Sequence, residues 1–350
     1  MKINESMLKK MHEATQTLMS EGPAAATVAI QEALQQHKPA TQKHTYYDDV
    51  IEVEAKEINT SADSSGQFIT QSYSNLAGSR DYKLYVPSGY SGEPLPLIVM
   101  LHGCTQNPDD FAAGTRMNAL AEAHNYLVAY PAQSQMANPN KCWNWFNAID
   151  QQRGQGEPAI ISGITHKIMQ THAVDKSQVY VAGLSAGGAM AVIMATLYPE
   201  LYAAVGVHSG LPHEAAHDLP SALTAMSGNA KSRSPKEPYS VRDARSDAIP
   251  IIVFHGDKDS TVHPSNAEQV MQENTPEIIA STTRHDNVPN GYGYTQTTFT
   301  DVEGKVLAES WLVHGAGHAW FGGSSQGSYT DGKGPDASQE MIRFFFSHKK

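Results

Sequence analysis

Residues 183–187 read Gly-Leu-Ser-Ala-Gly, a pattern that suits a serine able to attack a carbonyl group. A mostly apolar run, residues 178–182, precedes the pattern, and a stretch rich in Ala and Met follows it, as expected where a strand turns into a helix. A serine on such a sharp turn needs small neighbours, because larger side chains would collide there. The following helix points its positive N-terminal end at the oxyanion that develops during attack. We therefore predict that Ser185 is a nucleophile.

A serine nucleophile needs an acid and a base behind it, and strand–helix hydrolases supply them in the chain order Ser, Asp, His. Residues 255–259 read His-Gly-Asp-Lys-Asp and follow a predicted strand at residues 250–254. We predict Asp259 as the acid, because this acid usually comes a few residues after such a glycine. Asp257 is the alternative, since the chain order fits either aspartate.

The predicted base lies near the C-terminus, where residues 314–320 read His-Gly-Ala-Gly-His-Ala-Trp after a predicted strand. His318 follows two glycines, in a loop where an imidazole can turn toward the serine. His314 lies at the end of the strand, and we expect it to be structural. Because the chain contains 16 histidines, His318 is selected by its position and order rather than by its residue type.

The oxyanion needs two N–H donors, one from the residue after the serine and one from an early loop. Ala186 supplies the first, and the segment His-Gly-Cys-Thr-Gln at residues 102–106 is predicted to supply the second from Cys104. The side chain of Cys104 then has no catalytic role and is available to form a disulfide with Cys142. Two independent free thiols are the alternative, and neither cysteine has the Cys-x-x-Cys spacing of a redox site.

A second motif offers a different chemistry. Residues 213–217 match the zinc protease pattern His-Glu-x-x-His, in which a helix places His213 and His217 on one face with Glu214 as general base. Pro212 and Pro220 leave room for barely two helical turns, so we keep a zinc hydrolase as a remote alternative and predict no metal site.

The elements that must position these residues alternate between short apolar strands and helices. Strands are predicted at residues 97–101, 126–130, 178–182, 203–207, 250–254 and 310–313, and helices at residues 158–171 and 186–197. This alternation predicts an α/β fold with a mostly parallel sheet.

The N-terminal part of the sequence differs from the rest. Residues 1–40 contain two short amphipathic stripes separated by Gly22-Pro23, which predicts a helical hairpin extension. Residues 41–67 are polar and predict a linker, so we place the catalytic domain at residues 68–350.

Composition limits the partners of the chain. Its 350 residues carry 25 basic and 36 acidic side chains, a net charge of −11, which disfavours binding to nucleic acid. No apolar run is long enough for a membrane span, and two cysteines are too few for a disulfide scaffold. No signal peptide is recognisable, so we expect a cytoplasmic protein; removal of a leader would give the same sequence and a secreted or periplasmic one. The oligomeric state is left open.

Four segments together resemble the catalytic domain of poly(3-hydroxybutyrate) depolymerases and their relatives, the feruloyl and acetylxylan esterases. The resemblance runs from about Ser74 to the C-terminus and depends on residues 102–106, 142–146, 183–190 and 317–323. It implies an α/β-hydrolase fold, a cofactor-free reaction, the triad Ser185, Asp259 and His318, and the oxyanion donors Cys104 and Ala186. It also implies that Trp143 and Trp320 line the acyl cleft.

The resemblance implies a serine carboxylester hydrolase that forms an acyl-enzyme. The chain departs from secreted depolymerases because it shows neither their leader nor their polymer-binding module, so we expect 3-hydroxybutyrate oligomers or other short soluble esters as substrates. Feruloyl or acetylxylan ester cleavage is the main alternative. A non-catalytic binding module is a third hypothesis, against which the intact order of the triad argues.

Overall fold

The computed structural model describes residues 66–229, 249–274 and 280–350, which belong to one compact unit, Ala62–Lys350. The predicted hairpin at residues 1–40 and nearly all of the predicted linker lie outside the described residues, so both stay predictions. No helix in the described ranges combines the length and apolarity that crossing a bilayer requires.

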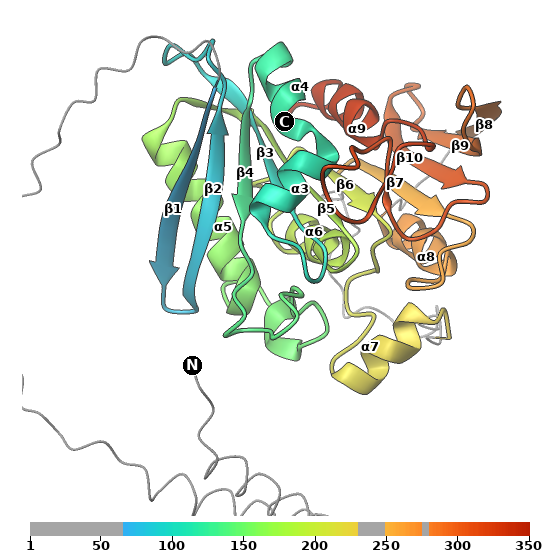
Figure 1. Ribbon diagram of the computed structural model, residues 1–350, viewed down its shortest axis with the longest axis horizontal. Coiled ribbons are helices and arrows are strands. Elements are labelled where there is room, and N and C mark those ends of the chain that lie inside the picture. Colours follow the sequence, from blue (N-terminus) through green and yellow to red (C-terminus); the bar gives the residue numbers. More distant parts are fainter. Residues whose placement is uncertain (1–65, 230–248, 275–279) are drawn as a thin grey trace, which may run out of the picture. The chain divides into compact units, whose positions relative to one another are not determined.

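A ten-stranded sheet forms the centre of the described unit, with the strand order β1-β2-β4-β3-β5-β6-β7-β10-β9-β8 (Figure 1). Its neighbours from β4 to β10 pair in parallel, whereas the pairs at both edges are antiparallel. The strands are β1 (Gln67–Asn75), β2 (Gly78–Val86), β3 (Leu95–Leu101), β4 (Leu127–Pro131), β5 (Val174–Leu184), β6 (Ala204–His208), β7 (Ile251–Gly256), β8 (Ala280–Asn287), β9 (Gly293–Thr300) and β10 (Val306–Val313). A separate parallel pair joins β11 (Trp320–Phe321) to β12 (Thr330–Asp331).

Helices cover both faces of the sheet and enclose two apolar cores. One core contains side chains of α5 (Gly156–Thr171), α6 (Ala186–Leu197), α7 (Leu219–Met226) and α8 (Ser265–Asn274). The other contains side chains of α3 (Pro108–Thr115), α4 (Met117–His124) and α9 (Ala337–Phe346). A short 3-10 helix, η1 (Ala148–Gln151), precedes α5. This arrangement of helices on both sides of a mainly parallel sheet is the predicted α/β architecture.

The central strands are apolar along their whole length because both of their faces are covered. Every residue of β4, β6 and β7 is buried, and so are nearly all residues of β3. Helix α6 is apolar all round for the same reason, and it ends before Pro199, as the sequence predicts. These elements are the ones whose positions the apolar runs predict within a few residues.

The edge strands of the sheet, β1 and β8, are not among the strands that the sequence analysis predicts. Strand β8 is exposed along its full length, and β1 alternates exposed and half-buried residues along most of its length, so neither shows a continuous apolar run. The sheet is therefore extended on both sides by strands whose sequences lack the signal of the buried ones.

The parallel strands bring the predicted site residues to one edge of the sheet. Cys104 follows β3, Ser185 follows β5, Asp259 follows β7 and His318 follows β10. Because parallel strands end at the same edge, residues that are far apart in the sequence meet there.

Candidate active site

Ser185 lies on a strained turn between β5 and α6. Its backbone has φ 58° and ψ −119°, a conformation that non-glycine residues rarely adopt, and its N–H donates to the carbonyl of His208 at 2.8 Å. A Cβ atom on Gly187 would lie 1.9 Å from the carbonyl oxygen of Leu101, and one on Gly183 would lie 2.3 Å from the carbonyl oxygen of Gly187. The two glycines of the motif are thus required because β3, β5 and α6 meet here almost backbone to backbone.

The predicted acid and base are hydrogen-bonded to each other across 59 residues of sequence. His318 Nδ1 lies 2.7 Å from Asp259 Oδ2, and the other carboxylate oxygen accepts the N–H groups of Thr261 at 2.9 Å and Val262 at 2.8 Å. The Asp259 side chain is fully buried, whereas the His318 side chain keeps a small exposed fraction. This arrangement leaves Nε2 of His318 as the ring nitrogen able to take a proton.

A second imidazole helps to fix Asp259. His255, at the end of β7, is buried, and its Nε2 lies 2.8 Å from the carbonyl oxygen of Val262 and 3.4 Å from Asp259 Oδ2. Burial by itself would raise the pKa of Asp259, but the hydrogen bonds from His255, His318 and the Val262 N–H outweigh it and hold the pKa well below its usual value. Asp259 therefore stays ionised over the whole working pH range.

Asp257, the alternative acid, holds a different partner. Its two carboxylate oxygens accept from the Gly315 N–H at 2.7 Å and from His314 Nδ1 at 3.2 Å. The two predicted candidates are thus separated by the structure: Asp257 ties down the start of the loop that carries His318, and Asp259 contacts His318 itself.

The loop after β3 leaves one backbone donor available. The N–H of Gly103 donates to Gln106 Oε1 at 2.9 Å, and the N–H groups of Thr105 and Gln106 donate to the carbonyls of Asn140 and Gly103. Within the described residues the N–H of Cys104 has no acceptor, and the same holds for Ala186, since the first residue of a helix has no intrahelical acceptor. The chemistry that these two donors permit is stabilisation of a negative oxygen.

The ring of His102 connects this loop to the chain at Gln133. It is buried, its Nδ1 lies 2.8 Å from the Gly103 carbonyl, and its Nε2 accepts the Gln133 N–H at 3.1 Å. Burial lowers its pKa to about 4, so the ring is neutral, with its proton on Nδ1. Its role is structural.

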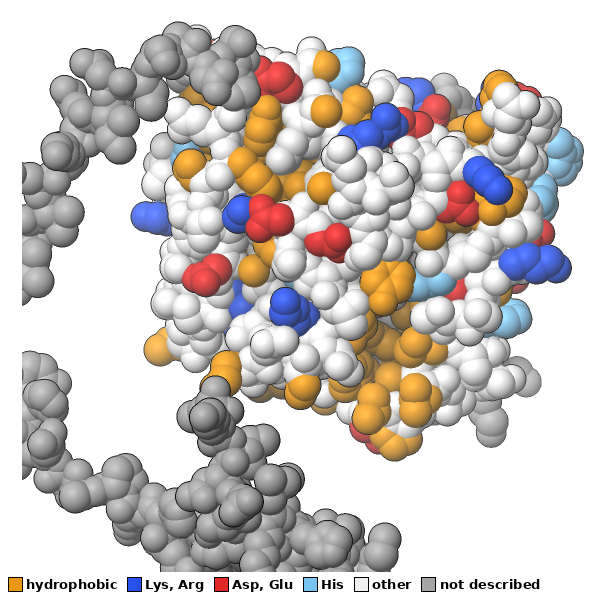
Figure 2. All heavy atoms as spheres, in the orientation of Figure 1, with side chains coloured by type: hydrophobic (Ala, Val, Ile, Leu, Met, Phe, Trp, Pro, Cys, Tyr) orange, Lys and Arg blue, Asp and Glu red, His pale blue; other side chains and the backbone are white. Residues whose placement is uncertain are grey.

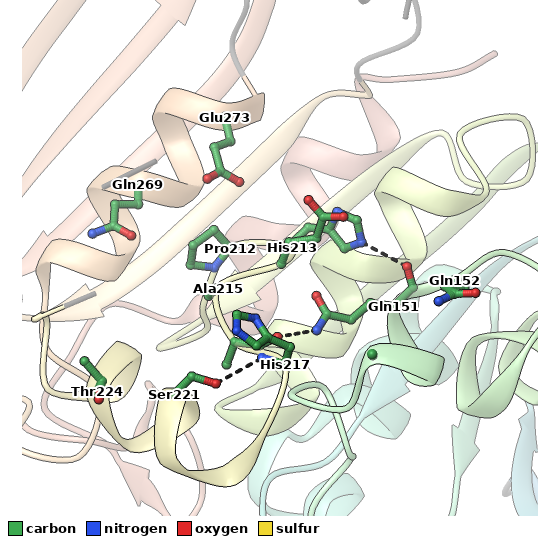
Figure 3. Close-up of a pocket in the computed structure, with 13 residues that line it drawn as sticks. Gln151, Gln152, Pro212, His213, Ala215, His217, Ser221, Thr224, Gln269 and Glu273 are labelled. Carbon is green, nitrogen blue, oxygen red and sulfur yellow. Dashed lines mark hydrogen bonds between the residues drawn. The ribbon is translucent and has the colours of Figure 1, made fainter. Parts of the chain in front are cut away.

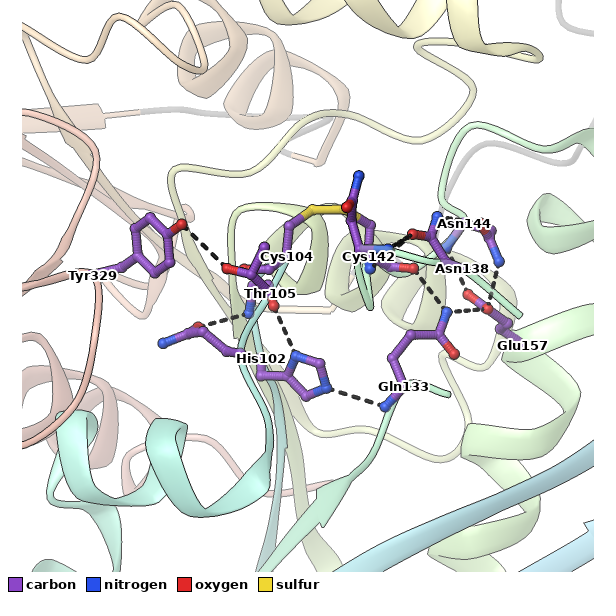
Figure 4. The surroundings of a disulfide bond; sticks show 12 residues. His102, Cys104, Thr105, Gln133, Asn138, Cys142, Asn144, Glu157 and Tyr329 are labelled. Carbon is purple, nitrogen blue, oxygen red and sulfur yellow. Dashed lines mark hydrogen bonds between the residues drawn. A yellow bond between two sulfur atoms is a disulfide. The ribbon is translucent and has the colours of Figure 1, made fainter. Parts of the chain in front are cut away.

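The predicted disulfide is present between Cys104 and Cys142, whose Cα atoms lie 4.1 Å apart (Figure 4). The alternative of two free thiols is therefore wrong for this structure. The bond ties the loop after β3 to the segment at residues 142–146, which contains Trp143.

The expectation that Trp143 and Trp320 line an open cleft is corrected by their burial. Trp143 is 0% exposed and Trp320 is 1% exposed. The Trp143 ring lies 5.6 Å from the His102 ring, and the Trp320 ring stacks 5.2 Å from the His208 ring. Both indoles pack beneath the site against buried histidines instead of pointing outward.

His208 is a site residue that the sequence analysis did not identify. It ends β6, its carbonyl accepts the Ser185 N–H, and its Nε2 accepts the Phe321 N–H at 3.1 Å. Burial lowers the pKa of His208 well below its usual value, and the nearby His255 and His318 lower it further. His208 is therefore a neutral side chain that connects the serine turn to the chain at Phe321. A signal does exist: a histidine lies within one residue of the carboxyl end of each of β3, β6 and β7.

The His-Glu-x-x-His segment is not helical. Residues 213–218 form turns and bends, and Glu214 has φ 60°, so the two histidines do not share a helical face. His213 Nε2 lies 3.3 Å from the Gln151 carbonyl (Figure 3). No group of three or more metal-ligating side chains occurs in the described part of the chain. The geometric basis of the zinc alternative is therefore missing.

The same segment lines a cavity of about 630 Å³ between η1, α7 and α8, and most of its lining side chains are polar (Figure 3). Two leucines one helical turn apart on α7, Leu219 and Leu223, are about 60% exposed. Figure 2 shows apolar side chains gathered at this edge of the molecule, where α7 lies. Helix α7 thus contributes Ser221 and Thr224 to the cavity, whereas its two exposed leucines are not part of the cavity lining.

The fold is that of the α/β hydrolases. An acetyl xylan esterase from Aspergillus awamori superposes with a TM-score of 0.56 at 20% identity, over 81% of this chain and 99% of that one. A ferulic acid esterase gives a TM-score of 0.51 at 14% identity, over 81% and 98%. These similarities establish the architecture on which the site is built.

Sequence similarity defines the family more narrowly. Residues 80–278 match the family described as Esterase PHB depolymerase, and the chain belongs to this family of carboxylic ester hydrolases. It is 34% identical over 242 residues to poly(3-hydroxyalkanoate) depolymerase C of Paucimonas lemoignei, covering 67% of this chain and 57% of that protein. It is 27% identical to feruloyl esterase B of Neurospora crassa, over 81% of this chain and 92% of that protein. The chain thus spans little more than half of the depolymerase but most of the feruloyl esterase.

The disulfide gives the first testable prediction. The bond joins cysteines 38 residues apart, so its reduction should lower the free energy of unfolding by roughly 4 kcal/mol, through loop-closure entropy regained by the unfolded chain. Thiol titration of the denatured, unreduced protein should find no thiol, and titration after reduction should find two. Two thiols before reduction would contradict the bond. Because disulfides persist in oxidising compartments, the same titration on protein trapped in cells tests the predicted cytoplasmic location.

The two aspartates give the second prediction. Asp259→Asn should lower kcat by about 10³- to 10⁴-fold, since an amide cannot hold the imidazole in the required tautomer, while the fold is retained. Asp257→Asn should lower kcat by no more than about tenfold, because it only loosens the start of the histidine loop. The measurement is kcat on a p-nitrophenyl ester, with circular dichroism as the folding control. A larger loss in Asp257→Asn would reverse the assignment.

Proposed function

We propose that this protein is a serine carboxylester hydrolase that acts through an acyl-enzyme, with Ser185 as nucleophile, His318 as base and Asp259 as the acid that orients it. The observation that carries the proposal is the 2.7 Å bond between His318 and buried Asp259, at the sheet edge where Ser185 occupies a strained turn. Membership of the ester hydrolase family supports the same reaction class.

In the first half of the reaction, Nε2 of His318 takes the proton of Ser185 Oγ as the oxygen attacks the ester carbonyl. The N–H groups of Cys104 and Ala186 bind the negative oxygen of the tetrahedral intermediate. The intermediate collapses when His318 returns the proton to the departing alkoxide. The alcohol leaves, and the acyl group stays on Ser185.

In the second half, His318 removes a proton from water, which attacks the acyl-enzyme through a second tetrahedral intermediate held by the same two N–H groups. The acid product leaves when the proton returns to Ser185 Oγ. Ionised Asp259 stabilises the imidazolium form of His318 in both halves, which its low pKa permits.

For the substrate, we propose 3-hydroxybutyrate oligomers or similar short polyester-type esters. Two relatives named depolymerases support this choice: depolymerase C of Paucimonas lemoignei and the poly(3-hydroxybutyrate) depolymerase of Ralstonia pickettii, of which the chain spans 57% and 48%.

The second candidate is a feruloyl or acetylxylan ester. It is favoured by the feruloyl esterase B of Neurospora crassa, most of whose length this chain matches. The polar cavity between η1, α7 and α8 favours neither candidate, because none of Ser185, Asp259 and His318 lines it. Against it, no indole lines an open cleft in the described residues, because each of the four tryptophans is buried.

The mechanism predicts the behaviour of a serine variant. Ser185→Ala should lower kcat by about 10⁴-fold or more without unfolding the protein, because no covalent intermediate can form. A phosphonate ester probe should label the unchanged protein at one site and should not label the variant, as intact-mass spectrometry would show. EDTA should leave the activity unchanged, and a metal-dependent loss of activity would contradict the serine mechanism.

The substrate proposal predicts the order of three activities. The kcat/KM for a 3-hydroxybutyrate trimer should exceed that for methyl ferulate and for acetylated xylo-oligosaccharide by at least about tenfold, if the substrate class follows the relatives named depolymerases. A preference for ferulate or acetylxylan would overturn the substrate and leave the mechanism standing. Clearing of a solid polymer film, measured beside these assays, shows whether the protein also acts on solid polymer.

A further inference from the structure

Glu157, at the start of α5, is a buried carboxylate that the proposed reaction does not use. It is 3% exposed, and every group bonded to its side chain is a donor. Oε2 accepts the backbone N–H of Asn144 at 2.7 Å, and Oε1 accepts from Asn144 Nδ2 at 2.9 Å, from Arg80 Nη2 at 3.2 Å and from Gln133 Nε2. Four donors on one carboxylate satisfy an ionised group and no other form of it.

The groups that Glu157 holds lead directly to the predicted oxyanion loop (Figure 4). Asn144 lies two residues after Cys142, whose sulfur is bonded to Cys104. Gln133 forms a second connection: its Nε2 also donates to the Cys142 carbonyl at 2.8 Å, and its backbone N–H donates to His102 Nε2 at 3.1 Å. Glu157 is thus connected to the Cys104 loop by two routes. One runs through Asn144 and Cys142 to the disulfide, and the other runs through Gln133 to His102, whose ring contacts the Gly103 carbonyl.

The segment that Glu157 holds lies outside the sheet, and Asn138 also contributes to it by donating to Asn144 Oδ1 at 2.9 Å and accepting the Cys142 N–H at 3.3 Å. Between the end of β4 and the start of α5, one turn of 3-10 helix is the only regular structure in this described stretch. No sheet ladder therefore sets the position of residues 142–144, which depends on hydrogen bonds, on the disulfide and on the burial of Trp143.

Burying a charged side chain costs free energy, so the groups around Glu157 must stabilise its ionised form. Burial raises the pKa of Glu157, and the nearby carboxyl of Asp150, which accepts the Glu157 backbone N–H at 2.7 Å, raises it further. Arg80, whose side chain is 10% exposed, is the cation that opposes both effects. Apolar packing could hold this loop at lower cost, but it would lack the directional bonds that fix a backbone N–H.

We propose that Glu157 is a positioning residue for the oxyanion hole, which holds the Cys104 N–H at the place where the ester oxygen becomes negative. The proposal rests on the proposed function, in which Cys104 supplies one of the two oxyanion donors. Glu157 contacts neither substrate nor triad, and it acts through Asn144, Gln133 and the disulfide.

The oxyanion exists only in the transition state and the intermediates, so a displaced donor weakens the transition state and leaves substrate binding almost unchanged. Glu157→Gln keeps the size of the side chain but places an NH₂ group against donors, which pushes the segment at residues 142–144 away. We expect kcat to fall about 10- to 100-fold, since displacement costs less than loss of a donor, with KM changed less than twofold.

A transition-state analogue separates this role from a merely structural one. Butylboronic acid forms a tetrahedral adduct with a catalytic serine and places an oxygen in the oxyanion hole. The inhibition constant for this acid should rise in Glu157→Gln by about the factor by which kcat falls. Glu157→Asp retains the charge on a shorter side chain and should have a smaller effect on both quantities; it also serves as the test variant if Glu157→Gln does not fold.

Glu309 provides a matched control. It is 2% exposed and accepts from Arg343 at 2.6 Å, Trp311 Nε1 at 3.1 Å and Gln296 Nε2 at 3.1 Å, but it lies on β10 away from the loop after β3. Glu309→Gln should lower thermal stability much as Glu157→Gln does, with kcat and the boronic acid inhibition constant within twofold of the unchanged protein.

A double-mutant cycle tests the connection through the disulfide. In the Cys104→Ser/Cys142→Ser background, where one of the two connections is absent, Glu157→Gln should lower kcat at least threefold less than it does with the disulfide present. Equal kcat values for Glu157→Gln and Glu309→Gln, or an unchanged inhibition constant for butylboronic acid, would overturn the proposal. If Ser185→Ala is inactive at the same time, the serine mechanism still holds and only the role of Glu157 fails.

Discussion

The close approach of three backbone segments, at the ends of β3 and β5 and the start of α6, is the constraint on which the rest of the site depends. Gly187 lies so near the Leu101 carbonyl that even a methyl group would overlap it, and a methyl group on Gly183 would likewise overlap the Gly187 carbonyl. This contact fixes the distance between the Ser185 turn and the loop that begins at His102. Both proposed oxyanion donors, one on each side of the contact, therefore have set positions before substrate arrives, as a preorganised site requires.

Three buried histidines extend this constraint across the sheet edge. His102, His208 and His255 end or follow neighbouring parts of the parallel sheet, and none of them reaches solvent. Each uses a ring nitrogen to hold a loop: His102 the oxyanion loop, His208 the chain at Phe321, and His255 the loop at Val262. Burial keeps the first two neutral, so they fix the loops without adding charge beside the proposed base.

The sequence predicts the central strands, α6 and the order of the site residues, because these features depend on local signals. A buried parallel strand needs a continuous apolar run, and the turn at Ser185 needs small residues in a set pattern. The edge strands β1 and β8 lack such runs because solvent covers them, and the sequence analysis does not identify them. Edge pairing depends on partners that are distant in sequence, which periodicity cannot show.

The sequence analysis leaves a second aspartate as an alternative acid and wrongly expects two tryptophans in a cleft. Both outcomes depend on the backbone conformation of segments outside the main sheet. Asp257 and Asp259 are two residues apart, and only the path of the loop after β10 gives one of them to His314 and the other to His318. Trp143 and Trp320 turn inward because His102 and His208 offer them ring surfaces, which no pattern in either segment indicates. The His-Glu-x-x-His match fails for the same reason, since its residues turn instead of forming a helix.

Two buried carboxylates at this sheet edge show how the site controls charge. Asp259 is surrounded by donors alone, two backbone N–H groups and two imidazoles, so its pKa falls although it is fully buried. Glu157 has as many donors, yet its pKa rises, first because it is buried and then because a second buried carboxyl, Asp150, lies beside it. Donor number is therefore not what separates the two carboxylates; burial and a like charge outweigh the donors at Glu157, whereas the donors outweigh burial at Asp259. The proposed acid of the triad is thus the carboxylate whose hydrogen bonds favour the ionised form most strongly, and the charge of Glu157 depends on Gln133, Asn144 and Arg80 together.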